Sequence, residues 1–301
     1  MSLVPDYSNR VEEPLAQTAA MARQWAAQNC AHNATGVSCK GYHGFWQYLR
    51  LMNLGQTLGG NADQYLRTMT DLSRDWDEQG NGTPRRILIS GCADYSMLAH
   101  VLHAFARAQV QPRITVLDIC PTPLKLNGWY AKSRDTSVEL VCSDLLRHCC
   151  VEGYDLIVTS SFLGYFGPNI RPRLFEVYAA LLSVGGRLVF SNRLRPSSED
   201  TQAGFTSEQT ERFARKVAEL SPKLPASATL ETADACRMAF DYAAIQCPFP
   251  VNSADTIRRL AADAGLKWRT GSHIAGLALQ RGVTGPTVGD GSDYVFAVLE
   301  K

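Results

Sequence analysis

Residues 85–102, RRILISGCADYSMLAHVL, decide the fold, because a buried strand runs through a glycine turn directly into a helix. The apolar run 87–89 has strand character and stops at Ser90-Gly91, and apolar residues at helical spacing follow from Met97 to Phe105. This order is typical of nucleotide-binding α/β domains. Gly91 is where a ligand can approach the backbone, although a glycine that merely ends a strand gives the same pattern.

The composition predicts a globular protein. The chain has 301 residues, 45% of them apolar, and a formal net charge of +1. This length and apolar content are enough to bury one large core, or a core with a smaller helical domain. Basic residues scattered among acidic ones argue against nucleic acid or a membrane surface as partner. No run is long enough to span a bilayer, and the first residues lack a secretory signal. We expect a cytoplasmic protein with a small-molecule substrate and a homodimer as one possible assembly.

The nine cysteines are an odd number and contain no CxxC pair. Several lie in strand-like segments, so they are predicted to be small core residues in a reducing compartment. His100 and His103 can share a helix face, but no acidic or histidine partner follows at metal-ligand spacing. The sequence therefore predicts neither disulfides nor a metal site.

Strand and helix patterns alternate between Pro84 and about Leu194, with loop lengths expected of a parallel sheet with right-handed crossovers. The predicted strands are 87–90, 114–118, 138–142, 156–160 and 187–192. The predicted helices are 95–108, 121–133, 145–148 and 172–184, the last ended by Gly185-Gly186. A capped helix from Ser253 and a terminal hairpin of strands 266–270 and 294–301 complete the sheet.

Two regions fall outside this alternation. Residues 1–82 are mostly helical in pattern and are predicted to form an N-terminal helical cap. Residues 83–301 then form the ligand-binding domain, which a helical insertion, 194–251, interrupts after the fifth strand. Both outside regions are candidates for a lid.

Two carboxylates follow strands at the sheet edge that holds Gly91. Asp118 ends the second strand and can accept both ribose hydroxyls of an adenosine ligand; the alternative is a cap for the helix from Pro121. Asp144, in Ser143-Asp144-Leu145 after the third strand, can accept the exocyclic amine of adenine while a backbone N–H meets a ring nitrogen. Because parallel strands end at one edge, these positions together indicate an adenosine site.

The ordered segments ILISGCA, VLDICP, VCSDLL, YDLIVTSSFLGYF and LLSVGGRLVFSN resemble the signature of class I S-adenosylmethionine-dependent methyltransferases, in their small-molecule branch. The resemblance covers about residues 85–194, and the terminal hairpin extends it to 301. It implies an α/β fold: a Rossmann-like, doubly wound, seven-stranded sheet with an antiparallel last strand. It also implies S-adenosylmethionine as cofactor, held by residues that follow the first four strands: Gly91, Cys92, Ala93, Asp118, Ile119, Ser143, Asp144, Leu145, Ser160 and Ser161.

The first turn departs from the family pattern. Ile89 replaces the usual acidic residue, and Ala93 and Tyr95 stand at the second and third glycines. The methionine end of the cofactor is therefore expected to find its contacts in the cap, in the segment 41–50, GYHGFWQYLR. Tyr48 or Arg50 can reach the amino-acid moiety there, while the alternative is an amphipathic helix that packs its aromatic side chains against the core.

Three residues past the second, fourth and fifth strands are the catalytic candidates: Asn127, Tyr165 and Ser191. An aromatic face can stabilise a sulfonium, and an amide or hydroxyl can orient a nucleophile. Trp129, Tyr130, Ser161 and Asn192 lie in the same segments. For each residue, ordinary helix or loop packing is the alternative.

The leading functional hypothesis is transfer of the sulfonium methyl to a small metabolite. No DPPY-type or NPPY-type segment follows the fourth strand, where SSFLGY stands instead, which disfavours methylation of DNA or glutamine. A second hypothesis follows from compatibility with the methyltransferase-like azetidine-2-carboxylate synthases, in which the cofactor's own amine displaces methylthioadenosine. A third is a non-catalytic cofactor-binding module.

Overall fold

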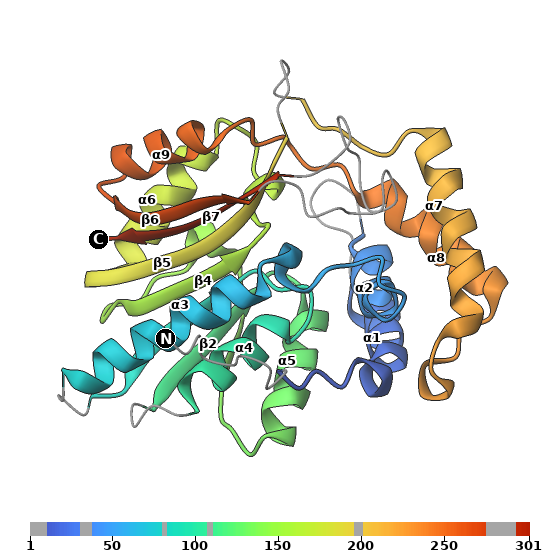
Figure 1. Ribbon diagram of the computed structural model, residues 1–301, viewed down its shortest axis with the longest axis horizontal. Coiled ribbons are helices and arrows are strands. Elements are labelled where there is room, and N and C mark those ends of the chain that lie inside the picture. Colours follow the sequence, from blue (N-terminus) through green and yellow to red (C-terminus); the bar gives the residue numbers. More distant parts are fainter. Residues whose placement is uncertain (1–10, 31–37, 80–82, 107–110, 196–200, 275–292) are drawn as a thin grey trace, which may run out of the picture.

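A single seven-stranded sheet forms the centre of the computed structural model, which describes residues 11–30, 38–79, 83–106, 111–195, 201–274 and 293–301 (Figure 1). The strands are β1 (Arg85–Ser90), β2 (Pro112–Asp118), β3 (Glu139–Cys142), β4 (Tyr154–Ser160), β5 (Leu182–Leu194), β6 (Lys267–Ile274) and β7 (Asp293–Glu300). Their order is β3-β2-β1-β4-β5-β7-β6, and β7 runs antiparallel to both neighbours. This confirms the sheet that the resemblance implies.

The strand order reverses at β1. This strand pairs in parallel with β2 on one side and with β4 on the other, so that Ile89 lies opposite both Val116 and Val158. In open α/β sheets, ligands bind outside the carboxyl ends of the strands at such a reversal. The turns after β1, β2 and β4 are therefore the place to look for a site.

Helices cover both faces of the sheet. On one face lie α3 (Ala62–Glu78), α4 (Ser96–Phe105) and α5 (Pro121–Ser133), and on the other lie α6 (Arg171–Leu181) and α9 (Ala254–Asp263). Because successive side chains in a strand point to opposite faces, Ile87 and Ile89 pack under the first layer and Leu88 under the second. Short 3-10 helices complete the connections: η1 (Thr57–Gly60), η2 (Leu145–Arg147), η3 (Leu163–Tyr165), η4 (Ser221–Lys223) and η5 (Ala226–Ala228).

The remaining four helices pack together beside the sheet edge. They are α1 (Leu15–Asn29), α2 (Lys40–Leu51), α7 (Ser207–Leu220) and α8 (Thr232–Ile245), and we call them the helical cap (Figure 1). Their own apolar core contains the fully buried rings of Phe45, Tyr48 and Phe213. Helices from both regions that the sequence sets outside the α/β pattern thus pack together as one unit.

Helix α3 belongs to the sheet layer although its residues lie within the predicted cap region. Tyr65 and Met69 are fully buried in the core beneath the sheet, and α3 packs against α4. The amphipathic pattern of α3 is the same whether it faces a sheet or other helices, so the sequence does not distinguish the two.

Several element ends differ from the sequence prediction by a few residues, and the largest shift is at the start of the fifth strand. The helix predicted over 172–184 ends at Leu181, and β5 begins at Leu182, which pairs with Tyr154 across a bulge. The glycine-rich turn predicted between the last two strands lies outside the described residues. Within the described ranges, no helix is both long and apolar enough to cross a membrane.

Candidate cofactor and active site

Gly91 makes the sharp turn after β1. Its φ is +67°, and its N–H donates to the carbonyl of Leu117 at 2.9 Å. A Cβ at this position would overlap the ring of Phe162, which follows β4. Only glycine combines this backbone with so close a neighbour. In this structure, packing against Phe162 accounts for the glycine, so the residue by itself is no evidence for a ligand.

Asp118, nearly buried at the end of β2, joins two turns. One carboxylate oxygen accepts a hydrogen bond from the N–H of Cys92 at 2.8 Å, and the other accepts from the N–H of Cys120 at 2.8 Å. Burial raises the pKa of Asp118. The residue does not cap the first turn of α5, whose N-cap is Cys120. Each oxygen keeps capacity for one more hydrogen bond, which is what two ribose hydroxyls require.

The end of β3 lies next to that of β2. The N–H of Ser143 donates to the carbonyl of Asp118 at 3.1 Å. One oxygen of Asp144 accepts from the N–H of Leu146 at 3.0 Å, and in the described part of the chain its other oxygen has no hydrogen-bond partner. Beside them, Ile119 is 70% exposed. An exposed aliphatic side chain can pack on a flat ring, and the carboxylate oxygen of Asp144 that accepts no hydrogen bond from the described residues can accept one from an amine on that ring. The side chain of Leu145 is buried, so only its backbone can face a ligand here.

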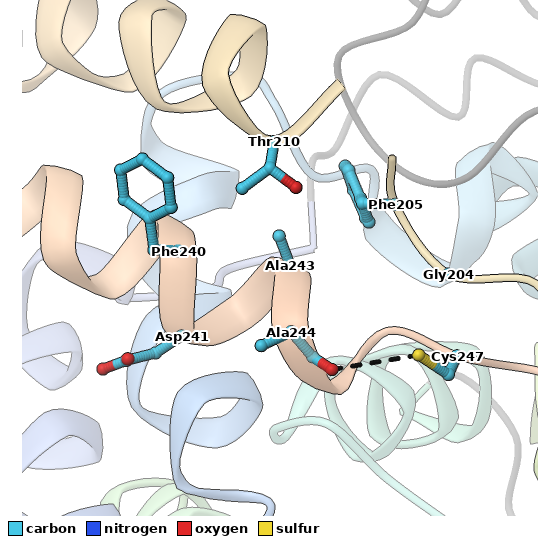
Figure 2. Close-up of a pocket in the computed structure, with 8 residues that line it drawn as sticks. All are labelled: Gly204, Phe205, Thr210, Phe240, Asp241, Ala243, Ala244 and Cys247. Carbon is cyan, nitrogen blue, oxygen red and sulfur yellow. Dashed lines mark hydrogen bonds between the residues drawn. The ribbon is translucent and has the colours of Figure 1, made fainter. Parts of the chain in front are cut away.

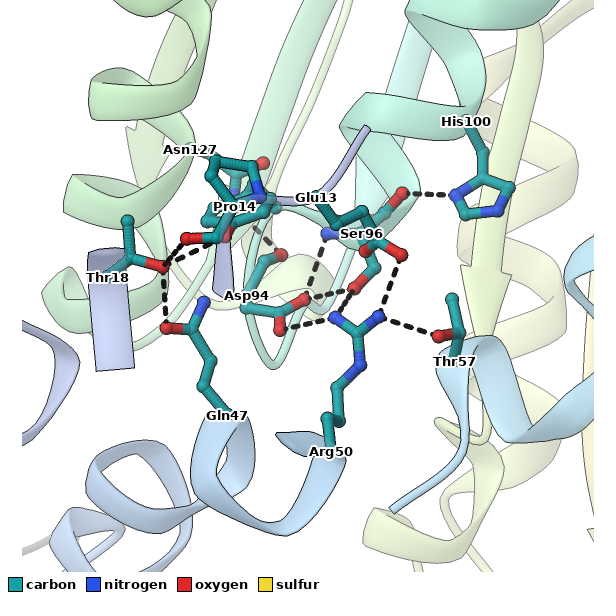
Figure 3. Close-up of polar contacts among 11 residues, drawn as sticks. Glu13, Pro14, Thr18, Gln47, Arg50, Thr57, Asp94, Ser96, His100 and Asn127 are labelled. Atoms are coloured by element: carbon teal, nitrogen blue, oxygen red, sulfur yellow. Dashed lines mark hydrogen bonds and ion pairs between the residues drawn. The ribbon is translucent and has the colours of Figure 1, made fainter. Parts of the chain in front are cut away.

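Arg50 reaches from α2 to the turn after β1 (Figure 3). Its guanidinium donates to Asp94 at 3.0 Å, Ser96 at 2.6 Å, Glu13 at 2.7 Å and Thr57 at 2.6 Å, and only 7% of the residue is exposed. Burial opposes the charge, but the two carboxylates hold the pKa of Arg50 above its ordinary value. Two anions around one cation leave a surplus negative charge. This network favours a cation over a carboxylate, so of the amino-acid moiety that the sequence analysis places near Arg50 it suits the ammonium end.

Asn127 is fully buried behind the same turn. Its side-chain N–H group donates to the carbonyl of Pro123 at 2.8 Å and to that of Asp94 at 3.2 Å (Figure 3). Its Oδ1 is buried and accepts no hydrogen bond from the described residues. Because a buried acceptor without a partner is costly, this atom is a candidate ligand contact.

Tyr95 and Tyr48 both point away from this edge. The ring of Tyr95 stacks on Tyr130 at 4.6 Å, and its hydroxyl lies 2.8 Å from Thr18 Oγ1. Tyr48 packs in the core of the helical cap, 6.3 Å from the ring of Phe45. In the structure, Tyr48 packs against the cap core, as in the amphipathic-helix alternative of the sequence analysis.

The serines at the ends of β4 and β5 are tied to α3. The hydroxyl oxygen of Tyr65 accepts from the N–H of Ser191 at 2.6 Å and lies 3.0 Å from Ser191 Oγ, which is 3.3 Å from Ser160 Oγ. Ser191 is 1% exposed. Ser161 has a φ of +55°, a strained value for a residue other than glycine. Within the described residues, Asn127, Tyr165 and Ser191 make no hydrogen bonds with one another.

Tyr165 instead meets aromatic residues of the helical cap. The ring of Tyr42, on α2, stacks on Trp46 at 5.7 Å and on Tyr242, from α8, at 5.9 Å. Burial raises the pKa of Tyr42 well above its ordinary value, and the neighbouring phenols of Tyr165 and Tyr242 raise it further. These rings stay neutral at pH 7 and form an electron-rich aromatic cluster. Tyr42 and Tyr242 are missed by the sequence analysis, because they lie in different helices far apart in the chain.

Arg193 is a third residue that the sequence analysis misses. It pairs with Tyr294 across β5 and β7. Its Nε is buried without a hydrogen-bond partner in the described ranges, and burial lowers its pKa, partly offset by Tyr294 and Tyr242. A partly desolvated guanidinium at the end of β5 can hold a carboxylate.

One further pocket lies in the insertion after β5 (Figure 2). Its lining comes from α7, α8 and the segments beside them: Gly204, Phe205, Thr210, Phe240, Asp241, Ala243, Ala244 and Cys247. None of these residues belongs to the turns after β1, β2 or β3, although Asp241 and Ala243 flank Tyr242 in α8. The pocket is therefore distinct from the edge that holds Asp118 and Asp144.

No protein-family model matches this sequence, and no curated protein matches it. Among solved structures, magnesium protoporphyrin IX methyltransferase from Synechocystis PCC 6803 aligns over 87% of this chain and 96% of its own, with 12% identity and a TM-score of 0.47. The N-methyltransferase NodS from Bradyrhizobium japonicum aligns over 85% and 97%, with 17% identity and a TM-score of 0.45. The 1,6-didemethyltoxoflavin N1-methyltransferase from Burkholderia thailandensis aligns over 79% and 78%, with 13% identity and a TM-score of 0.47.

Likeness at this level concerns the fold alone, and the sheet itself decides that question. Its strand order and its single antiparallel strand are those that the sequence resemblance implies. The chain has the class I methyltransferase fold. In this fold the edge built from Asp118, Ile119 and Asp144 lies at the carboxyl ends of the strands, where ligands of open α/β sheets bind.

Proposed function

We propose that the protein is an S-adenosylmethionine-dependent enzyme that transfers the sulfonium methyl to a small metabolite. The observation that carries the proposal is that three residues lie together at one edge of the sheet: Asp118, the exposed Ile119, and Asp144, which has one carboxylate oxygen without a described partner. Ribose hydroxyls, an adenine face and an exocyclic amine are the complementary groups. The fold supports the proposal but does not carry it.

Each adenosine contact has an assigned residue. Asp118 accepts from the two ribose hydroxyls with the lone pairs that the amides of Cys92 and Cys120 leave free. Ile119 packs on the adenine ring, and Asp144 accepts from its exocyclic amine. The backbone of Ser143 and Leu145 lies beside that amine. Cys92 and Ala93 supply the backbone along which the ligand runs.

When bound, S-adenosylmethionine supplies an electrophilic methyl group on a positively charged sulfur. The rings of Tyr42, Tyr165 and Tyr242 offer faces that stabilise such a charge. Glu13 and Asp94, which outnumber Arg50, attract the positive ammonium at the same end. The helical cap excludes water, so that these residues act at low dielectric and hold the acceptor in line with the methyl.

The acceptor is a small molecule that carries a negative group near its nucleophile. This follows from Arg193, whose guanidinium is partly desolvated next to Tyr242. A carboxylate in the acceptor would satisfy it. Ser161, held at a strained φ between β4 and the cap, supplies a hydroxyl near the same place.

One observation favours a second candidate, cyclisation of S-adenosylmethionine to azetidine-2-carboxylate with release of methylthioadenosine. Asn127 Oδ1 is a buried acceptor without a described partner beside the turn after β1. An acceptor there can take a hydrogen bond from the uncharged amine of the cofactor. This bond would orient the nitrogen lone pair toward the carbon from which methylthioadenosine leaves. Methyl transfer does not need such a contact.

Product analysis distinguishes the candidates. Purified protein is incubated with S-adenosylmethionine alone and with pools of small carboxylate-bearing acceptors, and the products are identified by mass. Methyl transfer predicts S-adenosylhomocysteine only when an acceptor is present. Methylthioadenosine with a cyclic amino acid in the absence of any acceptor would establish cyclisation instead. Tight cofactor binding without any turnover would leave the non-catalytic module.

A further inference from the structure

Three cysteines and a histidine converge where the helical cap meets the sheet edge. Cys30 Sγ lies 3.5 Å from Cys120 Sγ and 3.6 Å from His43 Nδ1, and Cys39 Sγ lies 3.5 Å from Cys120 Sγ. All four ligand atoms lie within 4.8 Å of one another. We propose that Cys30, Cys39, His43 and Cys120 bind one Zn²⁺ ion. This inference is independent of the reaction that the enzyme performs.

The spacing of the donor atoms matches a tetrahedral zinc site. With Zn–S bonds of about 2.3 Å and a Zn–N bond of about 2.0 Å, tetrahedral angles place neighbouring donors about 3.5–3.8 Å apart. Three of the six donor separations, at 3.5, 3.5 and 3.6 Å, fall within that range, and all six are within 4.8 Å, so a bound ion would draw the remaining donors slightly closer. Three thiolates and one imidazole are a set that soft, borderline metals prefer and that calcium and magnesium avoid.

The electrostatic surroundings suit a metal bound by thiolates. Zn²⁺ with three thiolates carries a net charge of −1. Cys39 is the N-cap of α2 and Cys120 is the N-cap of α5, so two ligands lie at the positive ends of helix dipoles. Thr122 Oγ1 lies 3.2 Å from Cys30 Sγ, where its hydroxyl can donate to a thiolate. Such outer contacts orient metal ligands.

A disulfide explains the cluster less well. A disulfide joins two sulfur atoms at about 2.05 Å, whereas three sulfurs converge here at 3.5 Å with an imidazole beside them. Any pair that oxidised would leave a third thiol and His43 without a role.

The ligands come from elements that only tertiary packing brings together. Cys30 ends α1, Cys39 and His43 lie at the start of α2, and Cys120 follows β2. The sequence analysis expects no metal site, because 76 residues separate His43 from Cys120 and no CxxC pair is present. With four protein donors the site is closed, which is typical of structural zinc. The metal would fasten the helical cap to the turn two residues beyond Asp118.

Metal content of the full chain is the first test. Protein made in zinc-supplemented medium and purified without chelators should contain about one zinc per chain, as measured by inductively coupled plasma mass spectrometry. Cys39→Ser and Cys120→Ser should each retain less than about a tenth of that amount. Cys149→Ser, at an exposed cysteine remote from the cluster, is the matched control and should retain it all. Equal loss of zinc in the control would overturn the proposal.

The second test uses only the wild-type chain, so it does not depend on the folding of variants. Zinc is removed with a chelator under reducing conditions and replaced with Co²⁺. We expect the intense visible absorption of tetrahedral cobalt and a thiolate charge-transfer band, both saturating at about one Co²⁺ per chain and abolished by Zn²⁺. Folded protein that gives only the weak absorption of octahedral cobalt contradicts the site. So does an isolated protein without metal in which alkylation reveals a disulfide among Cys30, Cys39 and Cys120.

Discussion

Single side chains at this edge of the sheet hold the turns in place and are also the groups that we propose to contact the cofactor. Asp118 holds the turns after β1 and β2 through two backbone amides, and the same carboxylate is the group that we assign to ribose. Arg50 likewise joins the cap to the first turn through Asp94 and Glu13. Because each residue has two roles, their substitution must be read with a stability measurement beside the binding measurement.

Asp118→Asn should weaken the binding of S-adenosylhomocysteine about 10- to 100-fold, which corresponds to about 1–3 kcal/mol for hydrogen-bonding groups left unpaired. Isothermal titration calorimetry measures the affinity, and thermal unfolding reports the cost to the turns. Asp71→Asn, on the exposed surface of α3, is the control and should leave the affinity unchanged. An unaltered affinity of the Asp118→Asn protein would refute our placement of the ribose.

Arg50→Ala should lower the free energy of unfolding by about 3–5 kcal/mol, because it leaves two carboxylates buried without their cation. Glu13→Gln should cost clearly less, since Asp94 still pairs with Arg50 and the surplus negative charge is gone. Urea unfolding curves give both values. If the two substitutions cost the same, the network does not carry the excess of negative charge described above.

At the scale of elements, the approach of α2 to α8 sets the position of Tyr42 against Tyr242. A Cβ on Gly41 would lie 2.7 Å from the backbone oxygen of Asp241, so the two helices can come this close only at a glycine. This contact positions the aromatic rings of the helical cap next to Tyr165.

Gly41→Ala should therefore destabilise the protein by about 1–3 kcal/mol, although alanine favours a helix, because backbone atoms of α8 must move. Gly128→Ala in α5 is the matched control. Its Cβ would meet only the Leu140 side chain at 3.0 Å, which can turn aside, so helix propensity should leave stability unchanged or raised by up to about 1 kcal/mol. Denaturant unfolding compares the pair, and a neutral Gly41→Ala would show that α2 and α8 have room to separate.

For the molecule as a whole, two apolar cores meet at the site. One lies around the sheet, and the other lies in the helical cap, where Phe213 packs 5.8 Å from Tyr242. The sheet presents Asp118 and Asp144, while the cap presents Tyr42 and Tyr242. The site is complete only when both cores are packed.

Phe213→Ala should cost about 3–5 kcal/mol of stability and reduce turnover of S-adenosylmethionine about tenfold or more, because Tyr242 loses its support. Phe175→Ala removes an equally buried ring of α6, on the other face of the sheet, and should cost similar stability with less than about a twofold change in turnover. Rates are measured at a temperature where both variants are folded. If the two substitutions change turnover equally, the packing of the helical cap has no specific role in the reaction.

The sequence by itself determined the sheet and the placement of Asp118 and Asp144 at one edge of it, where we propose that adenosine binds. The run 87–91, the carboxylates Asp118 and Asp144, and the helices between them follow from local periodicity and turn chemistry, which depend on residues close in the chain. The boundary between α6 and β5 was misplaced, because Leu182 is drawn into the sheet by its pairing with Tyr154.

Tertiary structure alone decided the rest. In the folded protein, α3 packs against the sheet and Tyr48 lies in the core of the helical cap. Arg50 lies between two carboxylates, those of Glu13 and Asp94. Tertiary packing also brought Tyr42 to Tyr242 and gathered the three cysteines around His43. The physical reason is that these contacts join elements far apart in the chain. Their formation depends on how two amphipathic faces pack, and the sequence pattern of a face does not identify its partner.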